Sequence, residues 1–381
     1  MLRKKLVWIG GAMQNNYKMK KYEAICFILI IMVNKLILNV PYYVIDLVST
    51  GAVINLIYIG LIGFIFVFCL NFLFQKFPNS DIIDIAEFLG GKVFKILLGI
   101  LFIAFFFFVS YTTLSDFANM IKTIYFDNSP LIFILLFFII GIVIANLAGF
   151  KAMVRTICLV VPFALISISL ALFAVYDEFS ISKFSPFFGY NFQTTFLNGL
   201  LNIFSLYVVT YYYFLLPLLK DSFTFKKVTI VSYIISWLLL FVTVVSILTI
   251  FPITNDTEPL NSLYLLSRKI ELGDFLQRLD AVFVLLWLIS TFCYLSISIF
   301  MINRIFKKLT TIADEKLITL STSSILFGLC LLPFNIAISR FIENIVYRYL
   351  IIGFIFIGCF IVLILANLKF KFSKKGNLPK R

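Results

Sequence analysis

The sequence predicts an all-α polytopic membrane protein that crosses the bilayer about ten times. Of its 381 residues, 62% are hydrophobic and 13% are charged, whereas about 25% of residues are charged in an average soluble domain. Apolar runs of about 20 residues, the length that an α-helix needs to cross a bilayer, recur along the whole chain. These runs are continuous rather than alternating, which argues against a transmembrane β-barrel.

The first span, residues 22–47, carries polar residues that a purely lipid-facing helix would lack. Asn34 and Lys35 lie in its middle, and Asn39 and Pro41 follow. Proline lacks a backbone N–H, and asparagine shortly before proline is typical of the start of a new helix. We therefore predict two half-helices with an opened joint, where many transporters bind a ligand. A proline-kinked span without a ligand fits this stretch equally well.

Nine further spans follow the first. The third is too long for a perpendicular crossing, so we expect it to tilt or protrude from the bilayer. The sixth is polar in mid-span and ends near Pro217. The predicted bounds of the nine are 52–74, 93–126, 130–148, 153–176, 192–219, 228–251, 281–306, 317–337 and 345–368.

The positions of the charges predict the orientation and the kind of partner. With the N-terminus in the cytoplasm, most of the 32 Lys and Arg residues fall on the cytoplasmic side, as the positive-inside rule favours, whereas Arg348 is among those that fall on the outer side. We predict one transmembrane domain over residues 22–368, between basic cytoplasmic tails at 1–21 and 369–381, with no fold before Tyr22. Because basic residues lie at the ends of the spans, the net charge of +14 indicates contact with the lipid bilayer and not with nucleic acid.

The spans divide into two halves of five, residues 22–176 and 192–368. An odd number of spans makes the second half enter from the opposite side of the membrane, as an inverted repeat requires. The ligand site of such a repeat lies between the first helices of the two halves. We therefore predict a five-plus-five inverted repeat in which the first and sixth spans are broken.

The composition also excludes several kinds of chemistry. The chain contains no His, which removes the commonest metal ligand and every His-based catalytic triad. Its six Cys residues lie inside apolar runs without a CxxC pattern, which is typical of small buried hydrophobes. We expect no enzymatic activity, no metal and no cofactor.

Several local patterns resemble one family. The stretch after the second span reads QKFPNSDIIDIAEFLGGKVFK, the fourth span begins NSPLIF, and the fifth is entered through GFKAMVRTICLVVP. The loop before the sixth span reads FSPFFGYN, and the eighth is entered through RLDAVFVLLWLISTFCYLSI, with Arg278, Trp287 and Phe292 at matching positions. From Met19 onward, this order of motifs resembles the B subunits of spore germination receptors.

The resemblance implies the amino acid–polyamine–organocation superfamily, with a LeuT-like fold of ten spans and broken helices 1 and 6. It implies the spore inner membrane as location, A-type and C-type receptor subunits as partners, and a nutrient such as an amino acid as ligand. One stretch departs from the family. Relatives often carry a glycine, and several a carboxylate, in the middle of the sixth span, where this chain reads FSLYVVTYYYF.

An amino acid ligand needs groups for its carboxylate and for its ammonium. The N–H groups of an opened half-helix suit the carboxylate, and hydroxyls and carbonyls suit the ammonium. For each Ser and Thr, a hydrogen bond to its own helix is the alternative. The candidate ligand-binding residues are Asn34, Asn39, Val40, Val109, Ser110, Thr113, Ser205, Thr210, Ser290 and Thr291.

Four charged residues are candidates for coupling or gating. Lys35 is ionisable near mid-membrane, which usually marks function. It either carries a proton, pairs with a carboxylate such as Asp116, or extends toward an interface. Arg278 and Asp280, beside the outer loop 252–280, either latch that loop or form an ordinary surface ion pair.

Three functions fit the predicted architecture. The first is a receptor subunit that binds a nutrient at the joints of the first and sixth spans and signals to its partners. The second is a proton- or sodium-coupled amino acid permease, and the third is a scaffold without a small ligand. Composition and periodicity do not separate them, whereas the resemblance favours the first.

Overall fold

In the part of the chain that the structure describes, the fold is helical throughout, with one isolated β-bridge between Met19 and Leu219. The structure is a computed structural model. It describes residues 17–38, 40–173, 179–180, 186, 188–189, 191–251, 262–268, 280–310, 312, 314–332, 345 and 347–375.

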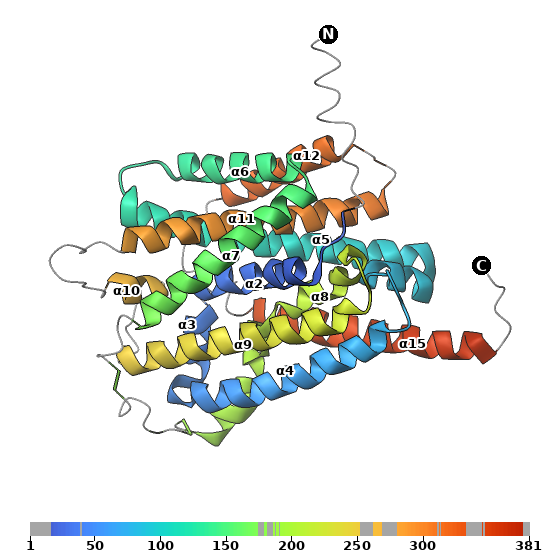
Figure 1. Cartoon of the computed structure of the whole chain (residues 1–381), viewed down its shortest axis with the longest axis horizontal. Helices are drawn as coiled ribbons and strands as arrows, with labels where there is room; N and C mark the ends of the chain where they lie inside the picture. The colour runs from blue at the N-terminus through green and yellow to red at the C-terminus, as the bar shows by residue number, and fades with distance from the viewer. Residues whose placement is uncertain are drawn as a thin grey trace, which may run out of the picture.

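The helices lie side by side in one bundle around α2 (Lys21–Ile37), which is almost completely buried (Figure 1). It packs against α7 (Phe150–Phe173), α9 (Thr224–Ile250) and α11 (Asp280–Leu309). The outer helices are α4 (Ala52–Phe74), α6 (Leu131–Leu147), α12 (Glu315–Cys330) and α15 (Cys359–Lys375).

Among the described residues, six helical stretches are long and apolar enough to cross a membrane, or seven if one bent pair counts as a span. This confirms a multi-pass, all-helical membrane protein. The six are Val40–Phe74, Ile82–Tyr125, Phe150–Phe173, Thr224–Ile250, Ala281–Leu309 and Arg348–Lys371; the bent pair is Gln193–Leu206 with Val209–Leu218, and α6 is a shorter apolar helix.

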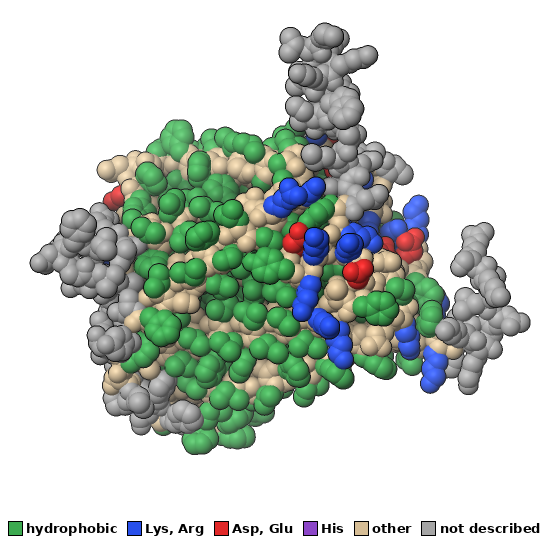
Figure 2. All heavy atoms as spheres, viewed as in Figure 1, with side chains coloured by type: hydrophobic (Ala, Val, Ile, Leu, Met, Phe, Trp, Pro, Cys, Tyr) green, Lys and Arg blue, Asp and Glu red, His purple; other side chains and the backbone are tan. Residues whose placement is uncertain are grey.

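Hydrophobic side chains cover most of the face seen in Figure 2, and Lys and Arg side chains gather toward one end. We call this the basic end of the bundle. Lys308, in the last turn of α11, and Lys369, in the second half of α15, both donate to the first turns of α5 (Ile82–Tyr125), at Asp84 and Phe88. This segregation follows the pattern of basic residues at span ends in the sequence.

The first span is interrupted where the sequence predicts. Helix α2 ends at Ile37, Leu38 has non-helical backbone angles, and α3 (Val40–Val48) begins one residue before Pro41. Pro41 has no N–H to donate to the carbonyl of Ile37, so the series of helical hydrogen bonds stops at this point. Asn39 lies outside the described residues. Helix α3 then continues through η1 (Ser49–Gly51) into α4, with a φ of 51° at Ser49.

The sixth span is interrupted as well. It consists of η4 (Gln193–Leu197), η5 (Asn198–Leu206), α8 (Val209–Leu215) and η6 (Leu216–Leu218). The two parts meet at a bend of 41° at Tyr207 and Val208, although neither glycine nor proline stands there.

The bounds of the third and of the last span differ clearly from the prediction. Helix α5 (Ile82–Tyr125) starts well before the predicted residue 93, because Asp81 caps it by accepting hydrogen bonds from the N–H groups of Ile83 and Asp84. The backbone turns at Gly91, whose φ of 71° suits glycine. The last span begins with α14 (Arg348–Leu350) and η8 (Ile351–Gly358), and α15 continues past the predicted end at 368.

The prediction of no fold before Tyr22 is wrong for the residues that precede α2. Met19 is fully buried, its N–H donates to the carbonyl of Leu218 at 2.8 Å, and its carbonyl accepts from the N–H of Lys220 at 3.0 Å. The Tyr17 hydroxyl donates to Glu23 at 2.5 Å. Burial and the Glu23 carboxylate raise the pKa of Tyr17 to about 12, so this donor stays protonated.

Candidate ligand site at two interrupted helices

The two interrupted spans are joined by a direct hydrogen bond. Tyr207, at the bend of the sixth span, donates its hydroxyl to the carbonyl oxygen of Ile31 in α2 at 2.5 Å. Both residues are fully buried. Ile31 lies about two turns before the interruption in the first span, so this hydrogen bond connects the bend of the sixth span to the half-helix that precedes that interruption.

The Lys35 side chain lies beside Tyr207. Lys35 is part of α2 and is only 4% exposed. The ammonium donates to the Thr113 hydroxyl at 2.9 Å. Three aromatic rings surround it, with Nζ at 5.9 Å from the ring centre of Tyr207, 5.6 Å from Tyr294 and 5.1 Å from Tyr347. We call Tyr207, Tyr294 and Tyr347 the tyrosine cage.

Asn34 connects the first span to the eighth. Its side-chain N–H donates to the Thr291 hydroxyl at 2.9 Å, and that hydroxyl donates to the Trp287 carbonyl one turn earlier in α11. Among the described residues, neither the Asn34 side-chain oxygen nor the Trp287 indole N–H has a hydrogen-bond partner. Buried polar atoms without partners are costly, so these two atoms are available to a polar ligand or water.

The candidate hydroxyls divide into two groups. Ser110, Ser205 and Ser290 each donate to a carbonyl of their own helical segment, at 2.7, 2.7 and 2.9 Å. This is the usual alternative for Ser in a membrane helix. Thr113 and Thr291 accept hydrogen bonds from Lys35 and Asn34, although Thr291 also donates to its own helix, while the buried Thr210 hydroxyl has no partner in the described part of the chain.

The structure places the remaining candidates as follows. Val40 and Val109 are buried. Asp116 is half-buried, three residues after Thr113 on α5. Asn39, Arg278 and the side chain of Asp280 lie outside the described residues, so the predicted latch at the outer loop does too.

Sequence reasoning missed the cage and one buried arginine. The three tyrosines come from segments far apart in the chain, so no local spacing points to them. Arg348, expected at an outer surface, is instead 6% exposed and donates to the carbonyl of Tyr43 in α3 at 2.7 Å. Its guanidinium lies 5.2 Å from the ring centre of Phe204 in η5, so it joins the last span to both interrupted spans.

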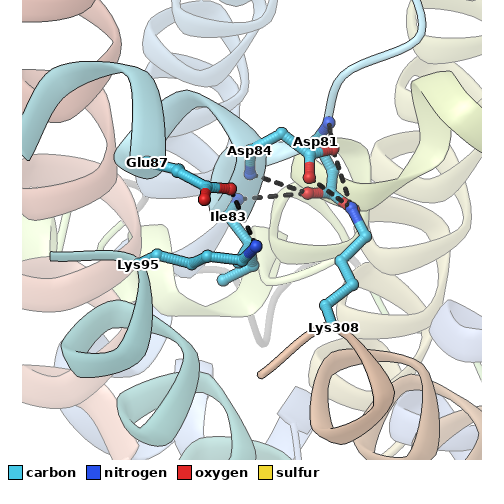
Figure 3. Close-up of polar contacts among 6 residues, drawn as sticks. All are labelled: Asp81, Ile83, Asp84, Glu87, Lys95 and Lys308. Carbon is cyan, nitrogen blue, oxygen red and sulfur yellow. Dashed lines mark hydrogen bonds and ion pairs between the residues drawn. The ribbon is translucent and has the colours of Figure 1, made fainter. Parts of the chain in front are cut away.

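A second polar cluster lies at the basic end. Lys308 approaches Asp81 at 2.5 Å and Asp84 at 2.7 Å, and Lys95 pairs with Glu87 at 2.7 Å (Figure 3). Asp81 is 1% exposed at its side chain. Burial raises the pKa of the Asp81 carboxyl, and the Lys308 ammonium opposes that rise. The cluster fastens the start of α5 to the end of α11.

The comparisons with known proteins point to one family. A family model described as spore germination protein matches residues 18–339. No curated protein gives a significant match. The matched range contains both interrupted spans, the basic-end cluster and two of the three cage tyrosines, Tyr207 and Tyr294.

Proposed function

The chain belongs to the spore permease family of spore germination proteins, and from that premise we propose that it is the nutrient-sensing subunit of a germination receptor. The nutrient is a small molecule, such as an amino acid, that binds at mid-membrane between the first and sixth spans. The observation that carries the proposal is the Tyr207–Ile31 hydrogen bond, which joins two interrupted helices amid buried polar side chains.

Binding at this place suits both ends of an amino acid. The first backbone N–H groups of α3 have no carbonyl partner within that helix, and they lie at the positive end of its dipole. They can therefore bind a carboxylate. The Asn34 side-chain oxygen and the Thr210 hydroxyl are buried polar atoms that can accept hydrogen bonds from the nutrient. A ligand that binds one arrangement of the two interruptions better than another shifts the population between them, and that shift is the signal.

We further propose the finer architecture that the family resemblance implies. Ten spans form a five-plus-five inverted repeat in the spore inner membrane, with both termini on the basic, cytoplasmic side. The gathering of Lys and Arg at one end of the bundle supports this orientation. The signal passes to A-type and C-type subunits by binding and rearrangement, without a catalytic step.

A proton-coupled amino acid permease is the second candidate, favoured by one observation. Lys35 is an ionisable group buried near mid-membrane, and Asp116 lies one turn from its partner Thr113. Ionisable residues inside the membrane often mark the ion or proton pathways of transporters. Uptake of labelled amino acids into vesicles that hold the purified protein separates the two: accumulation driven by a proton gradient identifies a permease, and binding without accumulation identifies a sensor.

The test compares two buried asparagines in otherwise identical spores. Asn34 donates to Thr291, and Asn71 in α4 donates to Thr229 in α9, each at 2.9 Å. Spores that lack this gene are complemented with the native gene, with Asn34→Leu or with Asn71→Leu, and their germination is measured nutrient by nutrient. We expect the native gene and Asn71→Leu to restore the lost response.

The Asn34→Leu protein is expected to be present in the membrane at the level of the native protein. It is not expected to restore the nutrient response. A dose response unchanged by Asn34→Leu, at equal protein level, would remove this interruption from the nutrient site. A deletion that alters the response to no nutrient would reject the sensing role itself.

A further inference from the structure

The tyrosine cage has the chemistry of a binding site for amines. Tyr207 and Tyr294 are fully buried and Tyr347 is 5% exposed. An aromatic ring carries partial negative charge on its faces, and several rings around one ammonium form a common recognition site for amine ligands. The three rings come from the bend of the sixth span, from α11 and from the residue before α14, so the cage exists only in the assembled bundle.

We propose that the tyrosine cage is a site for a primary ammonium group, which the Lys35 side chain fills from within in this conformation, and that the ammonium of the nutrient replaces it there. The last part rests on the proposed function; the existence of the ammonium site does not. Lys35 is then a tethered competitor, and the cage selects nutrients that carry a primary amine.

The replacement follows from charge and geometry. Two ammonium groups repel each other strongly inside a region of low dielectric constant, so the cage holds one at a time. Lysine has a flexible four-carbon stem and readily takes another position. Thr113, which holds its ammonium at 2.9 Å, and Asp116 lie three residues apart on α5, hence on one helical face. Lys35 therefore moves toward Asp116 when it leaves the cage.

The exchange reaches the neighbouring spans. Asn34, next to Lys35 in the chain, bonds to Thr291, and Thr291 lies three residues before the cage residue Tyr294 on α11. Tyr207 holds the Ile31 carbonyl one turn before Lys35. A nutrient amine in the cage therefore acts on the contacts of α2 with both α11 and the sixth span.

The experiment empties the cage and offers it a free amine. Lys35→Ala and the native chain are purified in lipid nanodiscs, and thermal unfolding is followed by tryptophan fluorescence with increasing ethylammonium chloride. We expect the unfolding temperature of Lys35→Ala to rise by several degrees and to saturate at millimolar concentrations. The native chain, whose cage is filled, shows no saturable rise.

Three controls isolate the cage. Sodium chloride controls for ionic strength. Sodium propionate offers an organic anion of about the size of ethylammonium and so tests for the charge of the probe. The double variant Lys35→Ala with Tyr347→Leu removes one ring of the cage. None of them is expected to give a saturable rise. The proposal is overturned if Lys35→Ala does not respond to ethylammonium, or if the Tyr347→Leu combination responds equally.

If Lys35→Ala unfolds during purification, the amount of folded protein becomes the measurement. Purification in ethylammonium chloride is compared with purification in sodium chloride. Recovery of folded Lys35→Ala in ethylammonium alone supports the site, and equal losses in both salts contradict it. Neither form of the test needs spores, so a negative result with intact nutrient responses rejects the cage and leaves the sensing role standing.

Discussion

The protein holds two of its lysines in opposite ways. Lys308, at the basic end, is partly exposed and lies between two aspartates at 2.5 and 2.7 Å. Lys35, in the middle of the bundle, is 4% exposed and is held by a hydroxyl and three tyrosine rings. Carboxylates match one cation with full opposite charges, whereas rings accept any cation of suitable size. The first arrangement therefore suits a fixed fastening, and the second suits an exchangeable occupant.

The largest expected effect comes from removing the cation at the fastening. Lys308→Met leaves two neighbouring carboxylates, one of them buried, without their counter-charge. Breaking a buried ion pair costs about 3–5 kcal/mol, and we expect the lower end because Lys308 and Asp84 retain contact with water. Thermal unfolding in nanodiscs measures the loss.

Lys307→Met is the matched control for this prediction. Lys307 pairs with the exposed Glu315 at 2.6 Å, and such surface pairs contribute about 0–1 kcal/mol. Equal losses of stability for Lys307→Met and Lys308→Met would show that the basic-end cluster is no fastening.

The next effect tests the link between the interruptions. Tyr207→Phe keeps the cage ring but removes the hydroxyl that donates to Ile31, which costs about 1 kcal/mol for a typical buried hydrogen bond. We expect a nutrient response shifted to higher concentration. Tyr58→Phe is the control, because the Tyr58 hydroxyl also donates to a backbone carbonyl, that of Phe196, at 2.8 Å. Equal shifts in germination for both variants would place the link outside the signalling path.

The smallest change in stability is expected where the cation is exchangeable. Lys35→Met keeps about the same volume and removes the cost of holding a charge away from water. We expect unfolding close to that of the native chain together with a nutrient response shifted to lower concentration, because the Lys35 ammonium no longer competes for the tyrosine cage. If Lys35→Met destabilises the protein more than Lys308→Met, the contrast between the two lysines is wrong.

The sequence predicted the helical membrane fold, the family and the interruption of the first span, because each has a local cause. Asn34, Asn39 and Pro41 mark the first interruption within a few residues of one another. The bend at Tyr207 and Val208 has no such mark, since neither residue breaks helices by itself, so the packing of the whole bundle must impose it. Only the folded chain brings the cage tyrosines together, and for that reason no spacing reveals them.

Charged residues were harder to place than apolar ones. Arg348 was assigned to the outer surface by the count of basic residues, yet it is buried against Tyr43 and Phe204. A count of charges along the chain assigns each charge to one side of the membrane. It contains no information on the buried carbonyl groups and aromatic rings that the charged side chain contacts in the folded protein. The same limit applies to Lys35, whose ionisable nature was evident but whose three rings were not.

The pairing of Met19 with Leu218 and Lys220 ties the segment before α2 to the very end of the sixth span. Any sliding or tilting of that end therefore pulls on the residues that precede the bundle. A fluorescent probe attached at Tyr17, paired with an acceptor dye on a distant loop, would turn this contact into an optical signal of movement at the end of the sixth span.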